Sequence, residues 1–579
     1  MIRLIRRNLK GYALVCAVIA PLMMLVEVLM DLQQPTLMSD IVDIGVARRD
    51  LGYVTATGLQ MFAFALVGFV GGSSNSFFAS IASANMSARL REMLFGKVQS
   101  LSFAEIDRFK TSSLVTRLTN DVVQMQSMLT MLLRVMVRSP IICLGGIVMA
   151  VLLIPELSPI FIIVLPLIIA GIVLVLYRAV PLFMRVQSRL DRVNTVMREN
   201  LLGVRVVKTF GLERRQLESF GEANGGLTED SVRAQGRTIV LMPVVTLVMN
   251  FSVVAVLWFG GNLVISGGLP VGKIMAFVNY LVQITNSLMM AVNLVINLSR
   301  AQASASRINE VLAAQPSVAE PARPSVPAGT SVEFEHVSFR YRDSGDGVLR
   351  DISFRIGDGQ TLGIIGATGS GKSTLVGLIP RLYDPEEGCV RVGGVDVRTV
   401  PLAVLRREIG LVMQESTLFS GTVRDNLLFG REEASEEEIA QAVRDAQAFE
   451  FIDALPEGLM SPVEQRGKNF SGGQKQRLSI ARTLLANPGV LILDDSTSAV
   501  DLATESRLHG AIGERMAGST VIVIAQRISA VMHADRILVL DNGRVSALGT
   551  HEELLRSSEV YRSIVVSQLG EEALAHAAC

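Results

Sequence analysis

The chain is short of cysteine and of net charge, and each shortage limits what it can be. Its four cysteines, Cys16, Cys143, Cys389 and Cys579, lie far apart with no CxxC spacing, so neither a disulfide framework nor a cysteine metal site is expected. The 54 basic and 54 acidic residues cancel, which leaves no global field to attract an acidic partner, and no nucleic-acid partner is expected. Only 19% of residues are charged and 50% are hydrophobic, too apolar a composition for an ordinary soluble enzyme. We therefore expect a protein that lies partly in a membrane.

Six segments are long and apolar enough to span a bilayer. They lie at about residues 12–31, 57–83, 136–154, 158–180, 239–265 and 271–297. The first follows a basic start, as a secretory signal would, but its apolar run is longer than a signal core and is interpreted as a retained membrane anchor. The connections 84–135 and 181–238 are long and rich in arginine, so the positive-inside rule predicts that they and the basic N-terminus are cytoplasmic. An even number of spans then returns the C-terminus to the cytoplasm.

Proline is also missing over a long stretch, between Pro35 and Pro140. Apolar positions recur at helical spacing through residues 86–101. The second and third spans are therefore predicted to continue as helices beyond the membrane. Separate helices joined by loops are the alternative.

A second kind of sequence follows residue 330. Residues 312–330 hold four prolines among small residues and are interpreted as a linker after a membrane domain of residues 1–311. From 331 to 579, short β-branched runs such as "TLGIIG", "GVLILD" and "TVIVIA" alternate with polar helical stretches. This pattern is typical of an α/β domain with a parallel sheet.

The stretch "GATGSGKST" has the GxxxxGK[ST] spacing of a phosphate-binding loop. It follows an apolar strand and precedes "LVGLIPRLY", which we predict to be helical. The expected ATP-binding residues are Gly366, Ala367, Thr368, Gly369, Ser370, Gly371, Lys372, Ser373 and Thr374. Glycines let the backbone approach phosphates, Lys372 can reach the outer phosphates, and the Ser373 hydroxyl can ligate Mg²⁺. Asp494, at the end of the apolar run "VLIL", can complete the magnesium shell through water.

Between these two motifs lies "FSGGQKQR", and with it the chain resembles the ABC transporter family over nearly its whole length. The resemblance is to exporter half-transporters, in which one six-span domain is followed by one nucleotide-binding domain. It implies that Ser471, Gly472, Gly473 and Gln474 form the signature that caps a nucleotide held by the other subunit. A serine and two glycines before a long helix also suit that role by offering backbone donors. The one departure in the signature is Phe470 in place of leucine.

The same resemblance implies further positions. Tyr341 would stack on adenine, Gln414 would sense Mg²⁺ and the membrane domain, and Asp501 would belong to the loop that links the two sites. Short coupling helices that touch the nucleotide domains are implied near 101–121 and 200–220.

Two departures from the family pattern fall in the hydrolytic residues. Asp495 occupies the position of the general-base glutamate, and Gln526 that of the switch histidine. The shorter side chain retracts the carboxylate by about 1.5 Å, although a base must lie within about 2.6–3.2 Å of the proton it takes. Glutamine donates a hydrogen bond but neither takes a proton nor carries charge. We therefore expect ATP to bind and hydrolysis to be weak at this chain's own site.

In this family each site pairs one chain's phosphate loop with the other chain's signature. A homodimer of this chain would then have two weak sites, whereas a heterodimer would have one weak and one competent site. We therefore predict a heterodimer, similar to asymmetric bacterial multidrug exporters. Its partner half-transporter would carry glutamate and histidine at the two altered positions, and the signature of this chain would complete the competent site.

Polar residues within the spans are candidates for the substrate cavity. Glu27 is costly to leave unpaired, so it either attracts cationic substrates or bonds to Asn or Gln on a neighbouring span. Gln283, Asn286 and Asn293 either line the cavity or bond between helices. Methionines such as Met24 and Met290 suit varied apolar ligands, or merely fill a core.

Three functions fit the sequence. The leading one is an ATP-driven exporter of lipophilic or drug-like compounds in a bacterial plasma membrane, using ATP and Mg²⁺. A lipid or peptide translocator of the same architecture differs only in its cavity contacts. A nucleotide-binding regulatory subunit that does not pump is favoured by the weak site and disfavoured by the complete signature.

Overall fold

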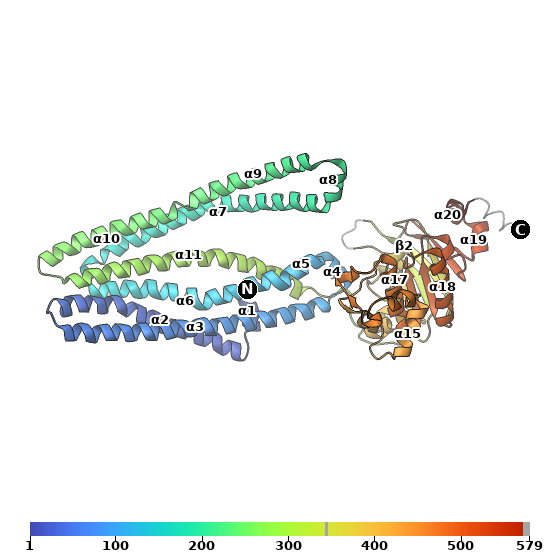
Figure 1. The fold of residues 1–579 in the computed structure, drawn as a ribbon, viewed down its shortest axis with the longest axis horizontal. Coiled ribbons are helices and arrows are strands. Elements are labelled where there is room, and N and C mark those ends of the chain that lie inside the picture. Colours follow the sequence, from blue (N-terminus) through green and yellow to red (C-terminus); the bar gives the residue numbers. More distant parts are fainter. Residues whose placement is uncertain (342–345, 499, 571–579) are drawn as a thin grey trace. The chain divides into compact units, whose positions relative to one another are not determined.

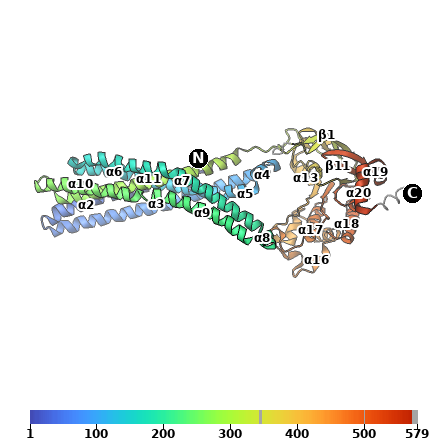
Figure 2. The same ribbon diagram turned by 90° about the horizontal axis from the view of Figure 1, so that it is seen from above.

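The chain forms two compact units in the computed structural model, which describes residues 1–341, 346–498 and 500–570. One unit contains Met1–Lys97 and Val115–Ala313 and is helical. The other contains Val98–Leu114 and the chain from Ala314 onward, and it holds all the described strands. Figures 1 and 2 show each unit from two directions.

The first unit consists of long helices. Its elements are α1 (Ile2–Asn8), α2 (Tyr12–Asp40), a π-helical turn (Ile41–Val46), α3 (Leu51–Gln99), a second π-helical turn (Arg117–Asp121), α6 (Val122–Leu153), a 3₁₀ turn (Pro155–Leu157), α7 (Pro159–Leu202), α8 (Val204–Phe210), α9 (Glu213–Thr238), α10 (Leu241–Ile265) and α11 (Val271–Ala313). The short helix α5 (Thr111–Thr116) includes the division between the two units after Leu114. Within the described residues, six helical stretches are long and apolar enough to cross a membrane, which confirms the predicted number. They are Tyr12–Val46, Leu51–Gln99, Thr111–Leu153, Pro159–Leu202, Glu213–Ile265 and Val271–Ala291.

The helices run well past the predicted spans. α3 is continuous from Leu51 to Gln99, and the helical stretch that contains α6 begins at Thr111, as the missing prolines indicated. In Figure 1, α2, α3, α6 and α11 lie side by side, while α7 and α9 form an antiparallel pair that ends in α8. Apolar side chains of α2, α6, α10 and α11 are buried together, among them Val28, Phe277 and Tyr280.

Polar contacts fix α2 and the π-helical turn that follows it against α11. Tyr280 donates its hydroxyl hydrogen to the backbone carbonyl of Leu32, with an oxygen separation of 2.6 Å. The Asp43 carboxylate accepts from two backbone N–H groups at the start of α11, those of Gly272 (2.5 Å) and Lys273 (3.0 Å). The first N–H groups of a helix have no partner within the helix, so Asp43 acts as a cap supplied by a distant segment.

The second unit is built on a six-stranded sheet. In the described part of the chain its order is β12 (Arg544–Gly549), β11 (Arg536–Asp541), β3 (Thr361–Ile365), β10 (Thr520–Ile524), β9 (Val490–Asp494) and β6 (Ile409–Val412). Only β12 pairs antiparallel. The runs predicted as strands are therefore neighbours in one parallel sheet, β3, β10 and β9, and the fold class is confirmed.

Smaller sheets and helices surround this core. A four-stranded antiparallel sheet has the order β2 (Leu349–Ile356), β1 (Val332–Phe339), β4 (Glu387–Val392) and β5 (Val395–Asp396), and β7 (Gly421–Thr422) pairs with β8 (Pro462–Val463). The helices are α12 (Lys372–Gly377), α13 (Leu402–Glu408), α14 (Val423–Leu428), α15 (Glu436–Asp445), α16 (Phe449–Asp453), α17 (Gly472–Leu485), α18 (Leu502–Arg515), α19 (His551–Ser557) and α20 (Glu559–Leu569).

The helix predicted over "LVGLIPRLY" is wrong beyond its first turn. α12 ends at Gly377, and turns follow as far as Tyr383. Pro380 has no N–H to continue a helix, and Arg381 has a positive φ of 54°.

The segment Val98–Leu114 belongs to the second unit although it lies between two long helices of the first. It contains the short helix α4 (Phe103–Phe109), within the stretch predicted to hold a coupling helix. Glu105 is buried and accepts hydrogen bonds from the backbone N–H and the hydroxyl of Ser317. The sequence analysis assigned this segment to the membrane domain of residues 1–311. It could not place the segment with the second unit, because the residues that it contacts are more than 200 positions away.

The contact between Asp43 and α11 predicts a stability effect. Replacing Asp43 by alanine leaves two N–H groups without their acceptor, so the protein in detergent should lose about 1–2 kcal/mol and melt at a lower temperature. The melting temperature, followed by circular dichroism, measures the loss of stability. Glu156→Ala, which changes an exposed acid in the next short connection, is the matched control. Equal melting temperatures for the two variants would contradict the capping role.

Candidate functional site

The phosphate loop connects β3 to α12 at the carboxyl edge of the large sheet. Gly371 has a φ of +101°, a backbone conformation that favours glycine, and a Cβ at Gly366 would lie 2.1 Å from the carbonyl oxygen of Leu540. The Lys372 ammonium donates to the carbonyl oxygens of Gly366 and Ala367, both at 2.9 Å. Backbone carbonyls thus hold the lysine over the loop, where an anionic group can exchange with them.

A cavity of about 230 Å³ opens at this loop. Its lining includes the backbone or side chains of Thr368, Gly369, Gly371, Lys372, Ser373 and Thr374 together with Gln414, Asp494, Asp495 and Gln526. Of the other predicted loop residues, Ser370 is buried with a hydroxyl that has no partner within the described residues. The sheet is the reason for this gathering, because the carboxyl ends of the parallel strands β3, β9 and β10 meet at one edge.

The donor set of the cavity suits Mg²⁺. Ser373 donates its hydroxyl hydrogen to Asp494 Oδ1 at 3.0 Å, so two hard oxygen ligands already lie together at the end of β9. Burial raises the pKa of Asp494, and the Ser373 hydroxyl opposes that rise. A divalent cation would remove the cost of burying this carboxylate beside a second one.

Asp495 lies under two amides. Its Oδ2 accepts from Gln526 Nε2 at 2.9 Å and from Gln414 Nε2 at 3.3 Å. Its backbone has a φ of +48°, in the left-handed region, and its N–H donates to the carbonyl of Ile524 at 3.0 Å. The two departures from the family pattern are therefore in direct contact with each other.

Burial strengthens Asp495 as a proton acceptor. Burial raises the pKa of the Asp495 carboxyl, and this rise is opposed by the Gln526 hydrogen bond and by the charge of Lys372. A higher pKa strengthens a base. Compared with glutamate, the aspartate side chain is one methylene shorter and so extends less far toward an attacking water. One of its two carboxylate oxygens already accepts two hydrogen bonds.

The loop that carries Gln526 is fastened by the last helix. Gln568 on α20 donates to the carbonyl oxygen of Gln526 at 2.7 Å and accepts from the N–H of Ile528 at 2.8 Å. Sequence analysis missed Gln568, since nothing in the sequence near residue 568 marks it as a neighbour of residue 526. Its two bonds fix the backbone of the loop while leaving the Gln526 side chain directed at Asp495.

The signature begins α17. Ser471 is its N-cap, with the hydroxyl accepting from Gln474 N–H at 3.3 Å while the Gln474 side chain accepts from Ser471 N–H at 2.8 Å. Phe470 is buried and contacts the ring of Phe451 with centroids 6.4 Å apart. Phe470 therefore anchors the start of the signature in the apolar core.

Tyr341 belongs to an aromatic cluster with Phe339 and Tyr383. The Tyr341 and Tyr383 rings meet edge to face with centroids 5.4 Å apart, and the Tyr341 hydroxyl lies 3.0 Å from Thr374 Oγ1. Tyr383 donates to Asp107 Oδ2 on α4 at 2.7 Å. Burial and the Asp107 carboxylate raise the pKa of Tyr383, so it stays a donor. Contacts thus run from α4 through Tyr383 to the end of the phosphate loop.

Asp501 lies at the start of α18 and accepts from Thr504 N–H at 3.0 Å, which lowers its pKa. This places it as a helix cap beyond β9.

The candidates in the membrane-spanning helices are not all brought together. Glu27 lines a cavity and pairs with Arg138 on α6, so the predicted partner, an Asn or Gln, is wrong. Gln283 and Asn286 do not line that cavity, and Gln283 Oε1 is buried without a partner in the described part of the chain. The side chain of Asn293 lies outside the described residues.

Comparisons with known proteins find relatives for both the helical and the strand-containing parts of the chain. Residues 17–288 match the family described as ABC transporter transmembrane region, and residues 349–498 match the family described as ABC transporter. The chain is 42% identical to the uncharacterized ABC transporter ATP-binding protein YfiB of Bacillus subtilis, over 97% of this chain and 98% of YfiB. It is 38% identical to the probable multidrug resistance ABC transporter ATP-binding/permease protein YheI of the same organism, over 66% of this chain and 65% of YheI.

Its fold is also similar to a solved structure of a bacterial Atm1-family ABC exporter with ATP bound. The TM-score is 0.81 at 26% sequence identity, and the match covers 96% of this chain and 98% of the other.

The Tyr383–Asp107 bond predicts how firmly α4 is held. Tyr383→Phe removes one hydrogen bond to a carboxylate, so the amides of Phe103–Phe109 should exchange with deuterium about tenfold faster. Hydrogen exchange with mass spectrometry measures this by segment. Tyr561→Phe, which deletes a buried hydroxyl bonded to His551, is the control and should leave α4 unchanged. Unaltered exchange of α4 in Tyr383→Phe would show that Asp107 does not hold it.

Proposed function

Because the chain belongs to the ABC transporter family as an exporter-type half-transporter, we propose that it is the asymmetric subunit of an ATP-driven exporter. Its own site holds ATP and Mg²⁺ and hydrolyses slowly. Its signature, Ser471 to Gln474, completes the competent site of a second, different half-transporter. The substrate is a lipophilic or drug-like compound taken from the cytoplasm or the inner leaflet of a bacterial plasma membrane, with both termini cytoplasmic.

The observation that carries the proposal is the cluster of Asp495, Gln414 and Gln526. An intact phosphate loop and Asp494 give the residues for binding ATP and Mg²⁺. Lys372 and Ser373 hold the phosphates and the metal, and bound Mg²⁺ supplies charge neutralisation for phosphoryl transfer. The short carboxylate at Asp495, held by two neutral amides, has neither the reach of glutamate nor a titratable neighbour in place of the switch histidine.

Asymmetry follows from the soundness of the signature. α17 keeps its cap and its two glycines, and the buried Phe470 precedes it. The signature is therefore intact, although two of the hydrolytic residues are altered. A chain that keeps the part serving its partner and loses the part serving itself fits a heterodimer. The name of YheI, a probable multidrug resistance transporter, supports drug-like substrates.

Restoring the family residues should restore hydrolysis. The chain purified alone should turn over ATP slowly, and the double variant Asp495→Glu with Gln526→His should raise the rate at least about tenfold, because a positioned base contributes about 10²–10⁴-fold. Steady-state phosphate release in nanodiscs measures this. Each single substitution should gain less than the double, since the two side chains are hydrogen-bonded and their effects are coupled.

Adding Lys372→Ala to the double variant is the control, and it should abolish the gain by removing the phosphate ligand. A double variant as slow as the original chain would mean that Asp495 and Gln526 do not limit hydrolysis. A rapid ATPase in the original chain alone would reject the weak site itself.

The heterodimer predicts which residue of this chain matters more to the assembled transporter. After copurification with the partner from native membranes, Ser471→Ala should lower ATP hydrolysis by about 10²-fold, as loss of a donor to a transition-state phosphate does. Asp495→Asn should cost much less, since it alters only the slow site.

Ser435→Ala is a matched control for the lost helix cap, because Ser435 caps α15 with the same capping box away from the nucleotide cavity. Equal losses from Ser471→Ala and Asp495→Asn, or copurification of only a second copy of this chain, would contradict the asymmetric assembly.

A further inference from the structure

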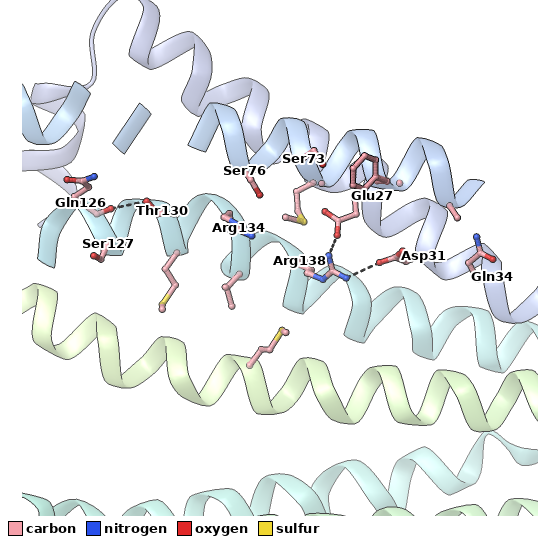
Figure 3. Close-up of a pocket in the computed structure, with 18 residues that line it drawn as sticks. Glu27, Asp31, Gln34, Ser73, Ser76, Gln126, Ser127, Thr130, Arg134 and Arg138 are labelled. Atoms are coloured by element: carbon pink, nitrogen blue, oxygen red, sulfur yellow. Dashed lines mark hydrogen bonds and ion pairs between the residues drawn. The ribbon is translucent and has the colours of Figure 1, made fainter. Parts of the chain in front are cut away.

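A cavity of about 980 Å³ lies among α2, α3 and α6 (Figure 3). Met290 of α11 also lines it. All of its lining residues belong to the first unit. One part of the wall is apolar and includes Met24, Phe69, Met131 and Met290, whose side chains can adapt to varied acyl or aromatic groups. The other part carries charges and hydroxyl groups, so the cavity is amphipathic.

Four charged residues line this cavity, two acids on α2 and two arginines on α6. Glu27 and Asp31 lie one turn apart on α2, and Arg134 and Arg138 lie one turn apart on α6. Arg138 donates to both acids, through Nη1 to Glu27 Oε1 and through Nη2 to Asp31 Oδ2 at 2.9 Å. Arg134 has neither an ion pair nor a hydrogen bond within the described part of the chain, and it is exposed to the cavity.

The pairing leaves the cavity neutral in sum but polarised. The cluster of Glu27, Asp31 and Arg138 carries one net negative charge, and Arg134 carries one positive charge about 6 Å farther along α6. Isolated charges are costly inside a membrane and commonly mark a ligand path. A bound cation alone would leave Arg134 without a partner, and a bound anion alone would leave the net negative charge of the cluster.

Asp31 is the acid that remains accessible. Its side chain is 41% exposed, against 17% for Glu27, and only one of its oxygens contacts Arg138. The Glu27 carboxylate instead lies close to α3, where a Cβ at Gly72 would be 2.6 Å from Glu27 Oε2. Glycine at this position thus makes room for the Glu27 carboxylate, and Asp31 is left facing the open volume.

The depth of Arg134 suits a polar head group. α6 ends at Leu153, and at about 1.5 Å per residue Arg138 lies about 22 Å and Arg134 about 28 Å before that end. The hydrocarbon core of a bilayer is about 30 Å thick. With Leu153 at the outer boundary, Arg134 lies at the level of the inner one.

We propose that this cavity binds a zwitterionic amphiphile, with the anionic group of its head on Arg134, the cationic group on Asp31 and the apolar body against the methionines. That this ligand is a transported substrate rests on the proposed exporter function. Binding itself requires neither hydrolysis nor a particular partner.

The test is a binding measurement on the full chain in nanodiscs without ATP. Three fluorescent probes share one alkyl chain and differ in the head, which is phosphoethanolamine, phosphate or primary amine. The phosphoethanolamine probe should bind at least about tenfold more tightly than the other two, as expected for one additional charge-assisted contact. Arg134→Gln and Asp31→Asn should each weaken it about tenfold.

The variants should also separate the two contacts. Arg134→Gln should leave the amine probe unchanged, Asp31→Asn should leave the phosphate probe unchanged, and Arg134→Lys should retain most of the phosphoethanolamine binding. Arg178→Gln, which removes an exposed arginine of α7 outside the cavity, is the matched control and should leave all three probes unchanged. Arg134→Lys also guards against a folding defect, because it keeps the charge.

Equal binding of the three heads, or a preference for the amine that only Asp31→Asn removes, would overturn the proposal. Competition by phosphatidylethanolamine in the nanodisc would identify a membrane lipid as the ligand, and probe binding without such competition would identify a free amphiphile. Either result supports the proposal. Because ATP is absent, failure here leaves the asymmetric hydrolysis intact, and a symmetric ATPase would leave the binding result intact.

Discussion

The parallel pairing of β3, β10 and β9 is the constraint on which the nucleotide site depends. It brings three strand ends to one edge, and those ends carry the phosphate loop, Gln526 and the two acids. In the sequence, the phosphate loop, the pair of acids and Gln526 are separated from one another by about thirty residues or more. Once the strands pair, the contacts between Ser373 and Asp494 and between Asp495 and Gln526 need only short loops to form.

Much of this arrangement could be predicted because its signals are local. Spans are read from apolar length, strands from short β-branched runs, and the phosphate loop from glycine spacing beside a strand. The continuity of α3 followed from the absence of proline. Each of these features depends on neighbours within one segment, which is the information that a single sequence holds.

The features that escaped prediction depend on distant partners. The sequence marks Glu27 as costly but does not say that Arg138, on another helix, pairs with it rather than an amide. Gln568 and Tyr383 resemble ordinary surface residues until the fold places them beside Gln526 and Asp107. The left-handed backbone of Asp495 is likewise set by the sheet edge, since its N–H bonds to β10. The two substitutions in the hydrolytic residues could be read singly, but their contact could not.

The placement of Val98–Leu114 in the second unit has a consequence for dissecting the protein. The chain crosses between the units three times, so the second unit is discontinuous in sequence. A fragment that starts after Ala313 lacks α4, and Tyr383, Ser317 and the backbone N–H of Val318 then lose the partners that Asp107, Glu105 and Ser102 provide. The nucleotide-binding domain as encoded after the linker therefore lacks these contacts, and a soluble version that keeps them needs the seventeen-residue segment, supplied by fusion or as a peptide.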